Sequence, residues 1–180
     1  RFLINCDSEN YDELTIGSAG GVDITFVREL SRVAPVQANG YRISVSGLRG
    51  GHSGERIGDG RGNAIRTLAL LLFALQERGS LELVSFIGGK ARNAIPSEAE
   101  AIVRTNLSEK ELQKIAAEQQ QRFMNSYGNA DPNAKIEIHA AEAAQEPLKA
   151  GDAMRLLRLL VLLHTGVYAM SQVVPGAVET

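Results

Sequence analysis

A histidine on a glycine-rich loop is the residue of this sequence with the clearest opportunity for chemistry. His52 lies in the run GLRGGHSG at residues 47–54, where little side-chain bulk hinders the close approach of a ligand. A neutral or protonated imidazole can donate a hydrogen bond to a developing oxyanion, so His52 could assist the hydrolysis of an acyl bond without binding a metal. Taken alone, the pattern fits a surface histidine in a glycine turn equally well.

The loop does not match three familiar glycine motifs. A phosphate-binding P-loop requires Gly-Lys-Ser/Thr after its glycines, and a dinucleotide-binding loop requires G-x-G-x-x-G leading directly into a helix. A serine-hydrolase elbow, G-x-S-x-G, requires glycine where this chain has Glu55. We therefore expect no nucleophilic role for Ser53.

Two further polar positions could contribute to a site. Asn93 lies in the connection at residues 88–96, and its amide can both donate and accept a hydrogen bond, although asparagine is also common in ordinary hairpin turns. Asp7, with Glu9 close behind it, follows the apolar run at residues 2–6. Carboxylates just beyond the C-terminal end of a buried strand occupy the usual active-site edge of an α/β sheet.

The composition excludes several classes of protein. The chain has 180 residues with 19 basic and 21 acidic side chains, and 44% of its residues are hydrophobic, which supports neither disorder nor a basic nucleic-acid footprint. Only five Phe and four Tyr are present, too few for an RNA-binding sheet that stacks bases on exposed aromatics. We expect no nucleic-acid partner.

The distribution of apolar, cysteine and histidine residues limits the remaining possibilities. The most apolar stretch, residues 156–163, contains Arg158 and is far shorter than the roughly 20 residues that cross a bilayer, so we expect no membrane span. Cys6 is the only cysteine, which excludes an internal disulfide and suits a reducing, cytoplasmic location. The three histidines, at 52, 139 and 164, lie too far apart in sequence for a histidine-rich metal site.

The elements expected to position these residues follow the order β-α-β-β-α-β over residues 41–141. Alternating apolar and polar side chains predict the strands, and apolar side chains at helical spacing predict the helices. The expected strands lie at 41–46, 81–87, 99–105 and 135–140, and the expected helices at 63–78 and 108–128. Ser108 and Glu111 form a capping box at the start of the second helix.

This order predicts an α+β, ferredoxin-like fold. Its four-stranded antiparallel sheet would carry two helices on one face, and the second and third strands would pair with each other. Outside this unit we expect a strand within residues 24–33, a helix capped by Asp152 that runs to about His164, and a strand at residues 167–170. That last helix is apolar nearly all round, so it needs cover on several sides.

The two ends of the sequence predict a piece of a longer protein. The chain begins at Arg1 within an apolar run, without a preceding turn, and it stops shortly after Pro175 and Gly176 without a polar tail. A stand-alone ferredoxin-like module that binds a small ligand, or regulates by dimerising, is the alternative interpretation. Such a module would have capped, polar ends.

In chain order, the motifs resemble the family of zinc-dependent dipeptidases and carboxypeptidases that includes carnosinases and peptidase T. They are most similar to the bacterial aminoacyl-histidine dipeptidases (Xaa-His dipeptidase, peptidase D). The matching segments are LINCDSE at 3–9, GSAGGVD at 17–23, GLRGGHSG at 47–54, GRGNA at 60–64, ARNAIP at 91–96 and VET at 178–180. The spacing of GGHSG and RNAIP is the most specific of these features.

The resemblance implies a two-domain metallopeptidase in which an α/β catalytic domain holds two zinc ions and a ferredoxin-like lid is inserted into it. Residues 1–23 would be the edge of the catalytic domain, 24–145 the lid and dimerisation domain with its core at 41–141, and 146–180 the return to the catalytic domain. Most of the family's metal ligands have no counterpart here and would belong to a missing catalytic domain of the same chain.

The same resemblance assigns a role to each of the three candidate residues. Asp7 lies at the position of one zinc ligand, His52 at that of the lid histidine that stabilises the tetrahedral intermediate, often across a homodimer, and Asn93 at that of a substrate contact. The implied substrate is a dipeptide of the Xaa-His type. The isolated piece is expected to be inactive and to bind no zinc.

Overall fold

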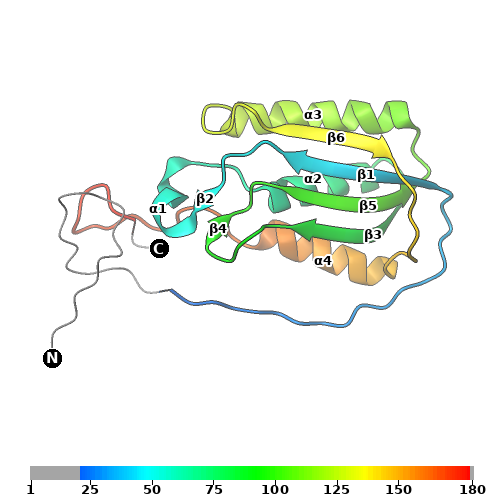
Figure 1. Cartoon of the computed structure of the whole chain (residues 1–180), viewed down its shortest axis with the longest axis horizontal. Coiled ribbons are helices and arrows are strands. Elements are labelled where there is room, and N and C mark those ends of the chain that lie inside the picture. Colours follow the sequence, from blue (N-terminus) through cyan, green and yellow to red (C-terminus); the bar gives the residue numbers. More distant parts are fainter. Residues whose placement is uncertain (1–20, 179–180) are drawn as a thin grey trace.

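The computed structural model describes residues 21–178, and a four-stranded antiparallel sheet forms the centre of the fold (Figure 1). The strand order is β3-β5-β1-β6, so β1, the first strand of the described residues, lies inside the sheet. The strands are β1 (Asn39–Ser46), β3 (Leu81–Gly88), β5 (Ala99–Thr105) and β6 (Lys135–Ala140). The predicted α+β fold and the antiparallel pairing of the second and third predicted strands, β3 and β5, are confirmed.

Three helices pack on this sheet, where the sequence predicted two within the ferredoxin-like unit. Helix α2 (Ala64–Gln76) contacts β1, β3 and β5, α3 (Glu109–Tyr127) lies along β6, and α4 (Ala150–Leu162) packs against α2 and β3 (Figure 1). The side chain of Asn63 caps α2, and the capping box of Ser108 and Glu111 starts α3 as predicted. Within residues 21–178, no helix combines the length and the apolar character that crossing a membrane requires.

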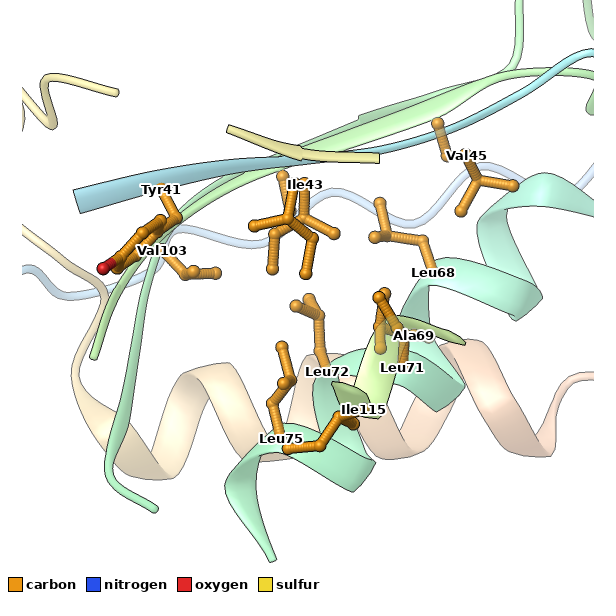
Figure 2. Packing of buried hydrophobic residues seen from close by; sticks show 14 of the residues in the cluster. Tyr41, Ile43, Val45, Leu68, Ala69, Leu71, Leu72, Leu75, Val103 and Ile115 are labelled. Atoms are coloured by element: carbon orange, nitrogen blue, oxygen red, sulfur yellow. The ribbon is translucent and has the colours of Figure 1, made fainter. Parts of the chain in front are cut away.

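The core lies between the sheet and α2. Alternate residues of β1, namely Tyr41, Ile43 and Val45, are buried on the face toward the helices, as the period of two requires (Figure 2). From the helix side, Leu68 and Leu72 are fully buried beneath them. Burying a leucine side chain stabilises a fold by about 2 kcal/mol, so this face of α2 fixes the helix on the sheet.

The chain's own groups pair some of the backbone groups at both outer edges of the sheet. On β6, the Gln120 amide donates to the carbonyl oxygen of Ala134 at 2.8 Å and accepts from the N–H of Ile136 at 2.8 Å. On β3, the carbonyl oxygen of Leu83 accepts from the N–H of Leu148 at 2.7 Å. At these positions, such pairing disfavours the addition of another strand.

Three sequence predictions outside the central unit are wrong. Residues 24–33 form no strand, because only Arg32 makes a bridge, with Leu148, and most of the segment's side chains are exposed. Residues 167–170 likewise contribute only one isolated bridge, from Met170. Asp152 does not cap α4, which begins two residues earlier because the preceding segment is already fixed against β3; its carboxylate instead accepts from Arg155 at 2.6 Å.

The prediction of a buried strand at residues 2–6, and with it Asp7, lies outside the described residues.

Candidate functional site

The structure brings His52 and Asn93 together at one end of the sheet. Strand β2 (Gly51–His52) pairs antiparallel with β4 (Ala94–Ile95), with His52 opposite Ala94 (Figure 1). The next amide along, that of Ser53, donates to the carbonyl oxygen of Asn93 at 2.8 Å. His52, in β2, and Asn93, in the turn just before β4, are both exposed to solvent although they lie far apart in sequence.

One imidazole nitrogen of His52 has a backbone partner. His52 is the N-cap of the short helix α1 (Ser53–Arg56), and its Nδ1 accepts a hydrogen bond from the N–H of Gly54 at 3.2 Å. In a neutral imidazole whose Nδ1 accepts, the proton lies on Nε2. In this tautomer Nε2–H is available as a donor, which is the form that can stabilise an oxyanion.

The backbone immediately before His52 requires glycine. Gly50 and Gly51 have φ angles of 59° and 117°, in the region that side-chain-bearing residues rarely adopt. A Cβ at Gly50 would lie 2.9 Å from the carbonyl oxygen of Ile95, and one at Gly51 would lie 2.7 Å from the Arg61 guanidinium. The two glycines thus allow β2 to approach β4 closely and set the direction of His52.

A buried carboxylate fixes both ends of the segment that carries His52. Asp131 has an exposed fraction of 0%. Its Oδ1 accepts from the N–H of Arg49 at 2.7 Å, and its Oδ2 accepts from the N–H of Gly62 at 2.6 Å. The segment of residues 50–61, which includes β2, α1 and the single turn η1 (Ile57–Asp59), is therefore held at both of its ends by the same Asp131 side chain.

Arg61 adds a second tie within this segment. Its guanidinium donates to the carbonyl oxygen of Gly50 and to the Asp59 carboxylate, the latter at 2.6 Å. The Arg61 side chain is only 16% exposed, so water screens these contacts less than it would screen a surface pair.

Sequence reasoning identified His52 and Asn93 but missed Asp131. Residues 128–132 appear in the sequence only as the turn that ends a helix, and an aspartate before a proline is ordinary there. Nothing local indicates that its side chain is buried. Only the packing of α3 beside the loop shows it.

The described residues do not fit a zinc site. Across residues 21–178, no three side chains of His, Cys, Asp or Glu lie close enough together to hold a metal ion. Of the other two histidines, His139 is exposed on β6, and Nε2 of His164 lies 3.1 Å from the carbonyl oxygen of Gly166.

Two known proteins are similar to this chain, one in sequence and one in fold. The cytosol non-specific dipeptidase of Escherichia coli is 34% identical over 180 residues, which cover 99% of this chain and 37% of that protein. The crystal structure of the aminoacylhistidine dipeptidase from Vibrio alginolyticus superposes with a TM-score of 0.78 at 27% identity, over 84% of this chain and 31% of that one. The chain thus spans about a third of the length of these relatives.

A family described as Peptidase dimerisation domain matches residues 40–132. The match begins in β1, ends just after Asp131, and includes both His52 and Asn93. Because it covers just over half of the chain, and both relatives are dipeptidases, this protein belongs to the peptidase dimerisation domain family.

Proposed function

We propose that this chain is the lid and dimerisation domain of a metallodipeptidase that hydrolyses dipeptides of the Xaa-His type in the cytosol. The names of both relatives support a dipeptidase, that of the Vibrio alginolyticus protein supports the aminoacyl-histidine substrate, and that of the Escherichia coli protein supports the cytosol. The lid would comprise residues 24–145, flanked by segments 1–23 and 146–180 of an α/β catalytic domain. The family match at 40–132 lies inside the proposed lid.

The observation that carries this proposal is the pairing of β2 with β4, which brings the backbones of two exposed residues, His52 and Asn93, to the same end of the fold. In the proposed role, Nε2–H of His52 donates to the oxyanion that develops on the scissile carbonyl. The Asn93 amide donates to and accepts from the peptide on either side of it. Contacts that form fully only as the oxyanion develops would stabilise the transition state more than the ground state.

The rest of the catalytic machinery is proposed to come from elsewhere. The described residues hold no metal cluster, so the two zinc ions implied by the family would be bound outside residues 21–178, with Asp7 as one ligand. His52 would act on a catalytic domain that belongs to its own chain or to the second copy in a homodimer. The 180-residue chain alone would then be inactive.

Substitution of His52 in a complete dipeptidase that contains this chain tests the proposal. His52→Ala is expected to lower kcat by roughly 100-fold or more, since the loss of one oxyanion donor has an effect of that size, while KM changes little. Asn93→Ala is expected to raise KM, because Asn93 is proposed to contact the peptide substrate. His139→Ala is the matched control, because this histidine is equally exposed but lies on β6.

Two results would contradict the assignment. A His52→Ala enzyme altered only in KM would remove the oxyanion role, and equal losses in the His52 and His139 variants would remove the site. Hydrolysis of dipeptides by the isolated 180-residue chain would contradict its role as a lid.

A further inference from the structure

A cavity lies between η1, α2, α3 and residues 165–167, and it shares Ile57, Gly58, Gly60 and Arg61 with the segment that carries His52. Its volume is about 510 Å³, within the range of about 300 to 1,000 Å³ typical of small-molecule sites. Its walls come from the first turns of α2 and the C-terminal half of α3. Neither His52 nor Asn93 lines it.

The charge of the lining is one-sided. Arg61, Arg66 and Arg122 line the cavity, whereas no aspartate or glutamate does. Arg61 is engaged by Gly50 and Asp59. The guanidinium groups of Arg66 and Arg122, by contrast, make no hydrogen bond or ion pair within the part of the chain that the structure describes.

The position of Arg66 is unfavourable for stability alone. It lies in the first turn of α2, where the positive end of the helix dipole disfavours a cation, and that turn contains no acidic residue to compensate. The side chain of Asn63 already satisfies the Arg66 N–H, so the backbone there does not need the guanidinium. An anion in the cavity would offset both the side-chain charge and the dipole.

The remainder of the lining combines apolar and polar side chains. Ile57, Leu70 and Phe123 contribute to the walls, and Leu70 has 43% of its surface exposed although it lies on a helix otherwise packed into the core. Ser126 and Gln119 add hydrogen-bonding groups from α3. Arginines together with apolar side chains suit a ligand that has a charged end and an apolar body.

We propose that this cavity binds a small organic anion, with a carboxylate or phosphate group held by Arg66 and Arg122 and an apolar body against Leu70 and Ile57. A cavity of about 510 Å³ is many times the volume of a water molecule, about 30 Å³, so an inorganic ion alone would leave most of it unfilled. The inference does not depend on the proposed dipeptidase function.

Binding to the 180-residue chain can be measured with four probes that separate charge from apolar contact. Hippurate and phenyl phosphate carry the charged group on an aromatic body, hippuramide lacks the charge, and inorganic phosphate lacks the body. Amide chemical shifts are followed by NMR during titration. We expect saturable shifts at Arg66, Thr67 and Ser126 with one or both organic anions, and binding of hippuramide and inorganic phosphate at least about tenfold weaker.

Arginine variants locate the anion. Arg66→Gln and Arg122→Gln are each expected to weaken binding of the organic anion by at least about tenfold. Arg42→Gln is the matched control, since this exposed arginine lies on β1 and pairs with Glu100 far from the cavity lining. Circular dichroism of each variant verifies the fold.

Several results would overturn the proposal. The first is that neither organic anion binds. The second is that hippuramide binds as tightly as hippurate, or that inorganic phosphate binds as tightly as both organic anions. The third is that Arg42→Gln weakens binding as much as the cavity variants do. A preference between hippurate and phenyl phosphate identifies the natural group as carboxylate or phosphate. Because no readout involves His52, failure here leaves the proposed dipeptidase role to its own test.

Discussion

Replacing Asp131 by asparagine tests whether one buried carboxylate holds the loop that carries His52. Both oxygens of Asp131 accept backbone N–H groups, from Arg49 at 2.7 Å and from Gly62 at 2.6 Å. Asparagine has almost the same shape, but one oxygen becomes an NH₂ group that faces a donor. One of the two hydrogen bonds must therefore be lost.

The size of the loss follows from the burial of this side chain. A hydrogen bond to a charged group contributes about 1.5 to 3 kcal/mol, and a buried donor left without a partner adds to the cost, so we expect Asp131→Asn to lower the free energy of unfolding by about 3 kcal/mol. Asp131 has an exposed fraction of 0%, so water cannot replace the missing acceptor. Because domains are stable by about 5 to 15 kcal/mol, the variant is expected to fold.

Urea denaturation followed by far-ultraviolet circular dichroism measures the change, since the chain has no tryptophan to serve as a fluorescent reporter. Asp59→Asn is the control: this carboxylate also accepts at short distance, from Arg61 at 2.6 Å, but it is 40% exposed. Its substitution is expected to cost less than about 1 kcal/mol.

Amide hydrogen exchange gives a local reading of the same variant. Residues 50–61 are expected to exchange faster in Asp131→Asn, while amides of β1 and β5 follow only the change in global stability. A loss below about 1 kcal/mol, a loss equal to that of the Asp59 variant, or uniform exchange across the fold would refute the reasoning.

Two further predictions concern the sheet edge and the start of α3. Gln120→Met leaves two backbone groups at the β6 edge without their side-chain partner, so we expect it to lower the free energy of unfolding by about 1 to 2 kcal/mol in urea denaturation and to promote self-association in light scattering. The control Gln121→Met loses only an exposed contact with Asn125 and should lower that free energy by less than about 0.5 kcal/mol. Equal losses in the two variants would contradict the edge argument. Hydrogen bonds from the Ser108 hydroxyl and backbone N–H lower the pKa of Glu111. The contribution of Glu111 to stability is therefore fully present above the ordinary glutamate pKa of about 4.3. It is lost as the pH falls through the lower pKa of the folded state. The difference in unfolding free energy between the parent chain and Glu111→Gln should therefore shrink over that acidic range, and a difference that does not change with pH would contradict it.

The sequence was sufficient for the central sheet because the information there is local. Alternation along β1 and β5, helical spacing along α2 and the capping box at Ser108 each depend on residues within a few positions of one another. The same local reasoning failed at α4, whose start is set by contacts of the preceding segment with β3 rather than by Asp152. Residues 24–33 alternate weakly and find no partner strand.

The candidate site was only half accessible to sequence analysis. His52 and Asn93 could be selected by residue type and motif, but β2 and β4 have two residues each, too few for any periodicity to show. Their pairing is a long-range contact made possible by Gly50 and Gly51. Asp131 acts through burial, and burial of a polar side chain in a turn depends on tertiary packing that no local pattern records.

The separation of roles around the loop makes variant data interpretable. His52 is exposed and contributes one hydrogen bond to its own helix cap, so His52→Ala should change turnover in a complete enzyme with little change in stability. Asp131 never reaches solvent, so Asp131→Asn should lower stability and, by loosening the loop, turnover as well, which marks a positioning residue. Rescue of turnover at low temperature in the Asp131 variant but not in the His52 variant would follow, because cooling can restore a loop's position but cannot restore a missing donor.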